Sequence, residues 1–126
     1  MEGPMSARVT LIVEFDIGPG RQGAYRAAVA ALRHAVGAQE PGMLTYDWWV
    51  SEDGQHGVAV EVFRDSAALV THMGSHASLV ADLLDAASLA SLKVLGPPTP
   101  EGRAAIEAAA SGFYSPLGGI ERRPLE

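Results

Sequence analysis

An Asp-Gly pair at positions 53 and 54 separates two stretches, 43–50 and 56–64, that are rich in β-branched and aromatic residues. A pair of this kind between two such stretches is the strongest short-range signal for a β-hairpin. A two-residue turn also fixes which residues face one another across the hairpin, and it places Tyr46 opposite Glu61. The sequence therefore predicts an antiparallel strand pair in the middle of the chain.

The rest of the chain alternates strands with helices. Residues 8–16 form an apolar, β-branched stretch before a Gly-Pro-Gly turn, which predicts a strand. Apolar side chains recur every three or four residues from Tyr25 to Val36, which predicts an amphipathic helix. A second helix is expected to begin at Asp65 or Ser66 and to run to about Ala86, with a break at Gly74-Ser75. Residues 88–95 then complete a fourth strand.

The order β-α-β-β-α-β is that of the ferredoxin-like fold, an α+β arrangement with an antiparallel sheet and both helices on one face. We expect a flexible N-terminus at 1–7, a ferredoxin-like domain at 8–96, and a C-terminal helical extension and tail at 97–126. The extension should contain a short helix capped by Thr99. It has few large apolar residues, so we expect it to pack on a sheet edge or on a partner subunit, anchored by Phe113 and Tyr114.

The predicted hairpin has two unlike faces, because neighbouring side chains of a strand point in opposite directions. We expect the valine-rich face to pack under the helices and the aromatic face, on which Leu44 lies opposite Phe63, to be the open face of the sheet. A turn longer than two residues would exchange the two faces. An apolar patch on an open sheet face marks an interface, a ligand site or both, so a homodimer is expected. Trp48 would then line a cavity, and Trp49 would pack under the helices or cover an edge. The aromatic face carries Leu44, Tyr46, Trp48, Ala59, Glu61 and Phe63, and the opposite face carries Thr45, Asp47, Trp49, Val58, Val60 and Val62.

Charge and composition exclude several classes of partner. The formal net charge is −6 and the basic residues are scattered, which argues against nucleic acid and against an anionic membrane surface. No apolar stretch approaches the length of a bilayer span, and the first residues lack the apolar core of a signal peptide, so we expect a cytoplasmic protein. The chain has no cysteine, which excludes disulfides and thiolate chemistry.

The candidate chemical groups are two histidines and one carboxylate. His72 and His76 are four residues apart on the second helix, a spacing that suits metal ligands, but no third ligand stands at motif spacing. We expect one of them to be a helix-end or core residue and the other to reach the cavity as an acid or base. Glu61 lies among aromatic residues of the hairpin, where a desolvated carboxylate could act as a general base. Glu14 is expected to be an exposed strand residue.

Two segments carry a family resemblance. The stretch EPGMLTY at 40–46 and the stretch EVFRDSAAL at 61–69, followed by His72 and His76, resemble the antibiotic biosynthesis monooxygenase family, of the dimeric α+β barrel type. Members often show E-P-G-x-x-x-Y, then E-x-W/F-x-D/S-x-x-A, then a histidine in the second helix. The resemblance covers roughly residues 8 to 96 and extends weakly into the tail, and Phe63 stands where the family often has Trp.

The resemblance implies a homodimer whose two sheets pack face to face, with a pocket in each subunit. It also implies, as for several members, oxidation of quinols or polycyclic phenols by O2 without metal or flavin. We therefore expect a cofactor-independent monooxygenase acting on a small planar aromatic, with Glu61 as the base and His72 as the alternative base. The residues expected to hold the substrate are Tyr46, Trp48, Phe63, His76 and Leu44.

Two other functions fit the same pattern. A barrel of this kind could bind a small aromatic without turnover, or it could bind haem with His72 or His76 as the axial ligand. Oxygen uptake with a panel of quinols distinguishes a monooxygenase from a protein that only binds the aromatic. The colour of the purified protein identifies bound haem.

Overall fold

A computed structural model of the chain describes residues 7–122. The expectation of a flexible N-terminus at 1–7 falls, apart from Ala7, outside the described residues, as does the end of the tail. Within 7–122, no helix combines the length and the apolar character that crossing a membrane requires. The elements are β1 (Val9–Ile17), α1 (Gln22–Gln39), β2 (Met43–Val50), β3 (His56–Phe63), α2 (Ser66–Met73), α3 (Ala77–Ala86), β4 (Ala87–Leu95), α4 (Pro100–Ile106) and β5 (Gly112–Tyr114).

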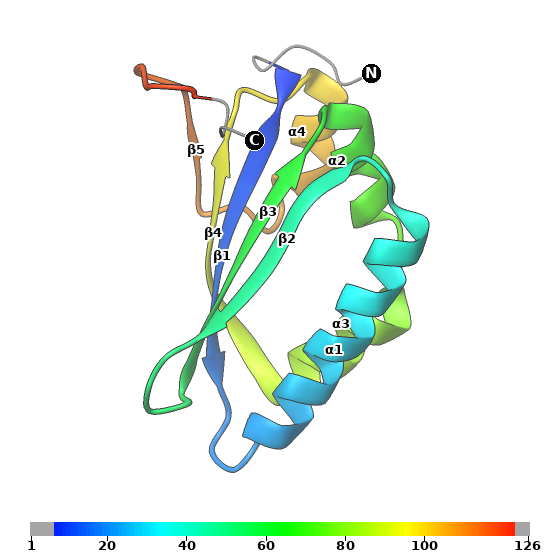
Figure 1. Ribbon diagram of the computed structural model, residues 1–126, viewed down its shortest axis with the longest axis vertical. Helices are drawn as coiled ribbons and strands as arrows, with labels where there is room; N and C mark the ends of the chain where they lie inside the picture. The colour runs from blue at the N-terminus through cyan, green and yellow to red at the C-terminus, as the bar shows by residue number, and fades with distance from the viewer. Residues whose placement is uncertain (1–6, 123–126) are drawn as a thin grey trace.

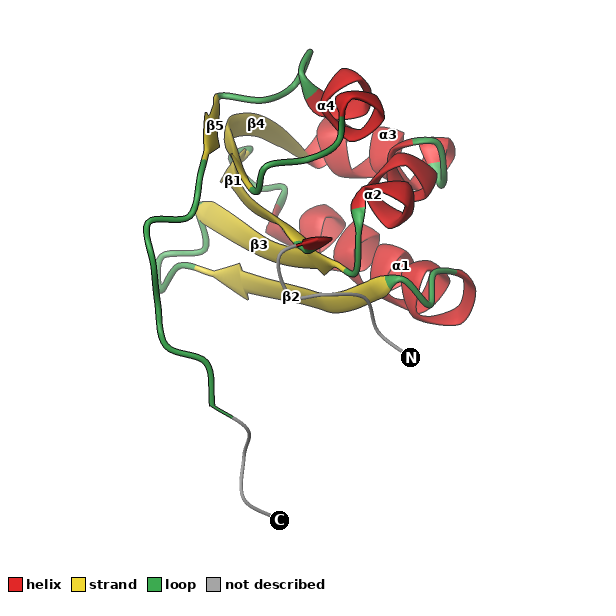
Figure 2. Cartoon of the chain, turned by 90° about the horizontal axis from the view of Figure 1, so that it is seen from above, coloured by secondary structure: helices red, strands yellow, loops and turns green. Residues whose placement is uncertain are grey.

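The strands form one sheet in the order β2-β3-β1-β4-β5, and the helices cover one of its faces (Figures 1 and 2). The first four strands are antiparallel to their neighbours, and β5 adds a parallel strand beside β4. The predicted α+β, ferredoxin-like class is confirmed. β2 lies at one edge of the sheet, and α1 runs alongside it across the helix-covered face.

The register of the β2–β3 hairpin follows the prediction at its centre. Tyr46 pairs with Glu61 and Trp48 with Ala59. Near the start of β2 the prediction is wrong, because the ladder shifts between Met43 and Thr45 and Met43, not Leu44, pairs with Phe63. Because of this irregularity, Leu44 has no partner in the ladder and does not follow the regular alternation of faces along the strand.

The face of the hairpin that packs under the helices is the aromatic one, so the expected assignment of the two faces is wrong. Ala59, Glu61 and Phe63 are buried, whereas the three valines that alternate with them, Val58, Val60 and Val62, are only half-buried on the open face. Trp48 stacks on Phe15 of β1 with ring centroids 5.8 Å apart, beneath the helices.

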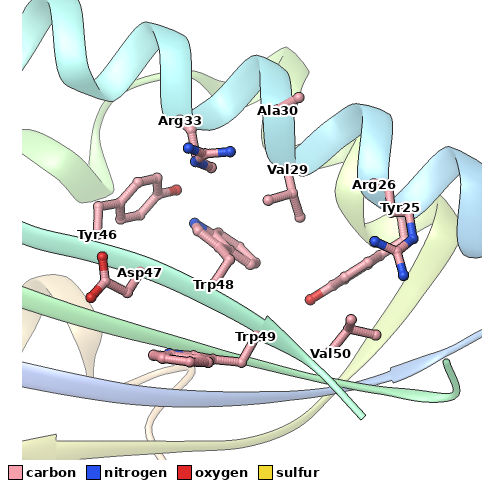
Figure 3. A pocket seen from close by; sticks show the side chains of 10 residues that line it. All are labelled: Tyr25, Arg26, Val29, Ala30, Arg33, Tyr46, Asp47, Trp48, Trp49 and Val50. Atoms are coloured by element: carbon pink, nitrogen blue, oxygen red, sulfur yellow. The ribbon is translucent and has the colours of Figure 1, made fainter. Parts of the chain in front are cut away.

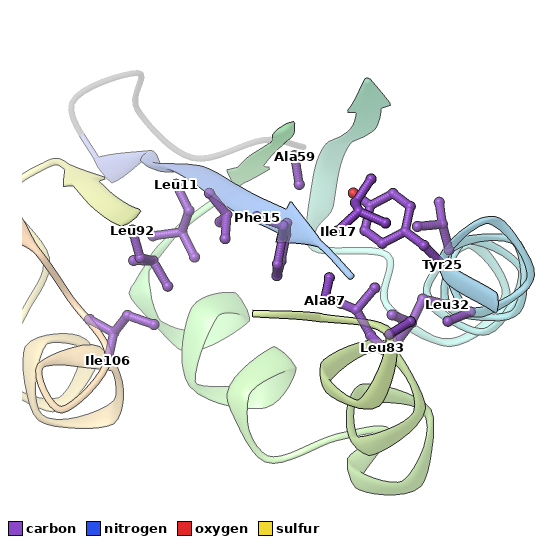
Figure 4. Close-up of a cluster of buried hydrophobic side chains, with 14 of the residues drawn as sticks. Leu11, Phe15, Ile17, Tyr25, Leu32, Ala59, Leu83, Ala87, Leu92 and Ile106 are labelled. Carbon is purple, nitrogen blue, oxygen red and sulfur yellow. The ribbon is translucent and has the colours of Figure 1, made fainter. Parts of the chain in front are cut away.

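The alternation of β1 explains this outcome. Val9, Leu11, Val13, Phe15 and Ile17 occupy one face of the strand and are buried in the core (Figure 4). The other face of β1 is interrupted by polar side chains, among them a glutamate. β1 pairs with β3 in a register that places Val13 beside Ala59, so these two residues share one face of the sheet. The valines of β3 share the other face with the polar residues of β1, and burying those valines would also have buried the polar residues.

The open face of the sheet is partly apolar. Trp49 lies there with 61% of its surface exposed, so the expectation that it packs under the helices is wrong. It pairs with Val58, while Ile12 pairs with Val60. Glu14 is half-exposed on the same face, as expected, with its carboxylate 3.9 Å from the Lys93 amine.

The helix boundaries have local causes. Asp65 caps α2 by accepting a hydrogen bond from the Ala68 N–H at 2.9 Å, as one of the two expected caps. The predicted break divides the second helix into α2 and α3, with Gly74 after α2 and His76 before α3. His76 has a φ of 62°, in the left-handed region that is uncommon for a residue with a β-carbon.

The C-terminal extension packs on a sheet edge, as expected. Thr99 accepts a hydrogen bond from the Gly102 N–H at 3.2 Å and so caps α4. β5 pairs with the last residues of β4, and Phe113 packs against the core beneath the Arg103 guanidinium, which lies 3.8 Å from the ring centre. Tyr114 is about half-exposed and anchors the segment less than Phe113 does.

Gly57 provides a test of core packing. A β-carbon at Gly57 would lie 2.0 Å from the Tyr25 hydroxyl, so Gly57→Ala should push apart β3 and α1. We expect a loss of about 1–3 kcal/mol in the free energy of unfolding, measured with urea. The matched control is Gly23→Ala in α1, where a β-carbon meets nothing within 4 Å, and where alanine should stabilise the helix by about 0.5–1 kcal/mol. Equal stabilities of the two variants would contradict this packing.

Candidate functional site

A buried carboxylate marks the junction of three helices. Glu40 is the residue that ends α1, and its backbone N–H donates to the Val36 carbonyl at 2.9 Å. Its side chain is only 4% exposed. A buried carboxylate is stable only when it is paired, and both oxygens of Glu40 are paired with imidazoles.

The two imidazoles come from either side of the break between α2 and α3. His72 Nδ1 lies 3.0 Å from both Glu40 oxygens, and His76 Nε2 lies 2.8 Å from Glu40 Oε2. On its other side, His72 Nε2 is 3.3 Å from Glu61 Oε1. That second contact is an ion pair without hydrogen-bond alignment, so Glu61 Oε1 has no hydrogen-bond partner among the described residues. We call Glu40, His72, His76 and Glu61 the acid–base cluster.

The cluster shifts the protonation of His72 in a defined direction. Burial alone would lower the pKa of His72, but the close negative charge of Glu61, and after it the hydrogen bonds and charge of Glu40, outweigh burial and raise the pKa above its usual 6.5. His72 therefore holds a proton more tightly than a free imidazole does, and it holds that proton between two carboxylates.

Tyr46 lies between the acid–base cluster and the aromatic wall of β2. Its ring centroid is 5.7 Å from that of His72 and 5.5 Å from that of Trp48, in edge-on contacts. Burial, then the nearby charges of Glu61 and Glu40, raise the pKa of Tyr46 far above its usual 10. The phenol thus keeps its proton and acts as a hydrogen-bond donor.

A cavity of about 530 Å³ opens between α1 and the edge strand β2 (Figure 3). Its size suits a small organic ligand. Trp48 forms its floor, with Tyr46 at one end and Tyr25 at the other, and Arg26 and Arg33 reach over it from α1 (Figure 3). The residues that line it are Tyr25, Arg26, Val29, Ala30, Arg33, Tyr46, Asp47, Trp48, Trp49 and Val50.

A neighbouring cavity of about 510 Å³ begins on the far side of Tyr46 and reaches Glu40. Both cavities are lined by Ala30, Arg33 and Tyr46, so these three residues form the boundary between them. Neither His72 nor Glu61 lines either of these two cavities. Tyr46 is therefore the residue through which the acid–base cluster meets the cavity.

The structure brings most of the predicted site residues together, but in different roles. Tyr46 and Trp48 line the cavity, and Glu61 and His72 form an ion pair behind Tyr46. Phe63 is fully buried, and its ring packs 5.5 Å from that of His72 rather than on the cavity wall. His76 binds Glu40, and Leu44 lies at the irregularity of β2, outside the core cluster. Among residues 7–122, no group of three or more His, Cys, Asp and Glu side chains has the arrangement of a metal site.

Sequence reasoning missed Glu40 and the two arginines of α1. Glu40 belongs to the Glu-Pro-Gly stretch, which predicts a turn and so hid the role of its side chain. The signal was the motif itself, since a turn alone does not require a glutamate. Arg26 and Arg33 are seven residues apart and so lie on one side of α1, a spacing that is visible in the sequence once the cavity is known.

Comparison with known proteins places the chain in a family. A family model described as antibiotic biosynthesis monooxygenase matches residues 8–81, more than half of the chain. A search of the curated proteins gave no significant match.

Several solved structures share the fold. The chain is similar to MupZ from Pseudomonas fluorescens, with 24% identity, a TM-score of 0.79 and coverage of 91% of this chain and 94% of that one. It is similar to PA3566 from Pseudomonas aeruginosa, with 31% identity, a TM-score of 0.58 and coverage of 73% and 93%. It is also similar to a mutant of SnoaB, described as a cofactor-independent oxygenase from Streptomyces nogalater, with 18% identity, a TM-score of 0.59 and coverage of 70% and 90%. The likeness to MupZ reaches into the C-terminal extension, because residues 1–96 are only about three quarters of the chain.

The raised pKa of His72 makes stability depend on pH. The folded state binds this proton more tightly than the unfolded state, whose imidazole has an ordinary pKa near 6.5, so protonated His72 stabilises the fold. This stabilisation is fully present below about pH 6.5 and is lost as the pH rises through the higher folded pKa. The free energy of unfolding should therefore fall over that window, measured by urea titration at a series of pH values. His72→Gln should lack this part of the fall, and parallel pH profiles of the two proteins would contradict the shift.

Proposed function

The chain belongs to the antibiotic biosynthesis monooxygenase family, and from that premise we propose that it oxidises a small planar phenol or quinol with O2. The observation that carries the proposal is the contact of Tyr46, on the wall of an aromatic cavity, with a buried histidine held between two carboxylates. The cavity supplies a place for the ring, and the acid–base cluster supplies a place for its proton.

The proposed reaction balances with substrate and O2 alone. A phenol with a free para position loses its hydroxyl proton and the para hydrogen, one oxygen atom enters at the para carbon, and the second oxygen leaves as water. The product is a quinone, and the electrons that reduce O2 come from the ring. A 1,4-quinol already carries oxygen at the para carbon, so it instead loses two protons and two electrons to give the quinone, and O2 is reduced to hydrogen peroxide. The protein needs to bind the ring, accept and return protons, and keep bulk water away.

The cavity residues support binding of a flat ring. Trp48 forms the floor of the cavity (Figure 3). Its indole also stacks on the Phe15 ring, which holds it in place. An aromatic substrate gains both buried area and ring contacts against such a surface. Tyr46 donates a hydrogen bond to a substrate oxygen and remains a neutral phenol, because its pKa is raised.

The acid–base cluster supports proton transfer, with Glu61 and His72 as the proposed catalytic residues. Glu61 Oε1 has an unused acceptor position among the described residues, and His72 connects it to Glu40. Tyr46 separates these groups from the cavity, so a proton from the substrate reaches them by way of the Tyr46 hydroxyl. Glu40 gives the proton a further destination within the cluster.

We propose that the reaction uses no bound cofactor, as the description of SnoaB states for that protein. The geometry favours this function over haem binding. Both nitrogens of His72 face carboxylates, and His76 Nε2 is 2.8 Å from Glu40, so neither imidazole is presented to an axial position.

We also propose that the protein is a homodimer that packs through the open face of its sheet. Helices cover only the other face (Figure 2), and the open face presents Trp49 beside Val58 and Ile12 beside Val60. The dimer was expected from the aromatic face of the hairpin, which is buried under the helices, and the proposed interface therefore consists of these open-face residues instead. Two-fold packing of identical faces closes the assembly at two subunits.

The catalytic role of Glu61 is tested by Glu61→Gln, which keeps shape and most hydrogen bonds but cannot accept the proton. We expect the fold and the affinity for ligand to persist and the rate of oxidation to fall at least about 100-fold, measured as O2 uptake with 1,4-dihydroxynaphthalene above the rate in buffer.

Glu107→Gln is the control, because Glu107 is an exposed glutamate at the end of α4, away from the cavity and from the open face of the sheet. It should keep the wild-type rate. Full turnover by Glu61→Gln would exclude Glu61 as the base and would make His72→Ala the next variant. Absence of O2 uptake by the wild type with every quinol tested would favour a binding protein without turnover.

The dimer is tested by Trp49→Glu, which places a charge at the centre of the proposed interface. Sedimentation at micromolar concentration should show a dimer for the wild type and a shift toward monomer for the variant, with at least about a tenfold weaker association. Tyr114→Glu is the control, since Tyr114 is a half-exposed aromatic residue on β5, at the opposite edge of the sheet. A stable wild-type monomer would rule out the interface.

A further inference from the structure

Three hydrogen-bond donors point to the same end of the cavity between α1 and β2. Figure 3 shows the Arg33 guanidinium above, the Trp48 indole nitrogen below, and the Tyr46 hydroxyl directed between them. The first comes from the helix and the other two from the edge strand, so the donors converge from opposite walls. The arrangement is that of a site for an acceptor.

Among the described residues, no carboxylate forms an ion pair with the two arginines above the cavity. Arg26 and Arg33 have no ion pair or hydrogen bond to other described residues, although the chain carries a net charge of −6. Asp47 lines the same cavity, but it pairs with Val60 and so belongs to the face of β2 that points away from the helices. Four other basic side chains each lie 2.6–3.9 Å from a carboxylate, in the pairs Arg21–Asp85, Arg64–Asp65, Lys93–Glu14 and Arg103–Glu107.

The Trp48 nitrogen is buried and makes no hydrogen bond of good geometry with the described residues, although it lies near enough to the Tyr46 hydroxyl to work against the rise in the pKa of that phenol. An indole nitrogen only donates, and a buried donor without an acceptor is unfavourable. The Tyr46 phenol adds a second donor of fixed protonation state. An acceptor supplied by the ligand would satisfy both groups and would also pair with Arg33.

We propose that the substrate of this site is an aromatic acid, whose carboxylate binds Arg33, the Trp48 indole N–H and the Tyr46 hydroxyl. A planar carboxylate matches the fork of a guanidinium, and its two oxygens offer enough lone pairs for the other two donors. Arg26, two turns away on α1, adds a second positive charge above the cavity. The inference rests on the proposed function only for the placement of the ring against Trp48.

Two ligands that differ by one carboxylate test the proposal. The probes are 1,4-dihydroxy-2-naphthoate and 1,4-dihydroxynaphthalene, titrated calorimetrically into the full chain without oxygen so that binding is measured apart from turnover. We expect the acid to bind the wild type at least about tenfold more tightly than the neutral quinol, and this preference to weaken as salt rises.

The variants assign the preference to particular groups. Arg33→Gln should abolish most of the preference for the acid while changing the affinity for the neutral quinol less than about twofold. Trp48→Phe keeps a ring and removes the N–H, so it should also weaken binding of the acid more than binding of the neutral quinol. Arg122→Gln removes the same charge from an exposed position in the tail and should leave both affinities unchanged.

Equal binding of the two probes by the wild type, or binding of neither, would overturn the proposal. So would an equal loss for both probes in Arg33→Gln, because that result would assign to Arg33 a role in general packing. Selective binding of the acid without O2 uptake would leave this inference standing and would count against the proposed oxidation, so the two proposals fail separately.

Discussion

The pairing of the Glu40 carboxylate with His72 and His76 is the interaction on which the arrangement of the site depends. It joins the end of α1 to both sides of the break between α2 and α3, and it does so where all three side chains are shielded from water. A buried charge of this kind is strongly destabilising if one partner is removed. The left-handed backbone at His76, a conformation that costs about 1–3 kcal/mol, is offset at the same place by the contact with Glu40. Through His72, the same pairing fixes the position of Glu61 and the surface against which Tyr46 packs.

The order of the elements and the centre of the hairpin register could be predicted because their causes are local. The Asp-Gly turn, the alternation of strand residues and the capping side chains of Asp65 and Thr99 each act within a few residues of the chain. The break at Gly74 is of the same kind. Such signals determine where elements begin and end, and in a hairpin they also determine which residues face each other.

The choice of which face is covered could not be made from the hairpin, because it depends on the neighbouring strand. A row of valines and a row of aromatic residues both suit a core, and the decision came from β1, where one face is wholly apolar and the other carries Glu14. The same non-local cause explains why the role of the Glu40 side chain could not be predicted. Its partners are 32 and 36 positions further along the chain, and nothing in the local sequence brings them together. The cavity arginines needed the covered face to be known first.

The short strand β5 has a consequence for how sheets from different molecules can meet. It pairs with Lys93, Val94 and Leu95, and its flanking residues bond the backbone of β4 from Leu92 to Gly96. The unpaired backbone of this stretch of β4 is therefore withdrawn from any approaching chain, whereas β2 at the other end of the sheet keeps its outer backbone groups. The edge on this side of the sheet is now the outer side of β5, and a strand of three residues offers few backbone groups to an incoming chain. Growth of a filament by successive addition of strands, the hazard that open β-edges carry, is thus disfavoured on one side by three residues of the tail.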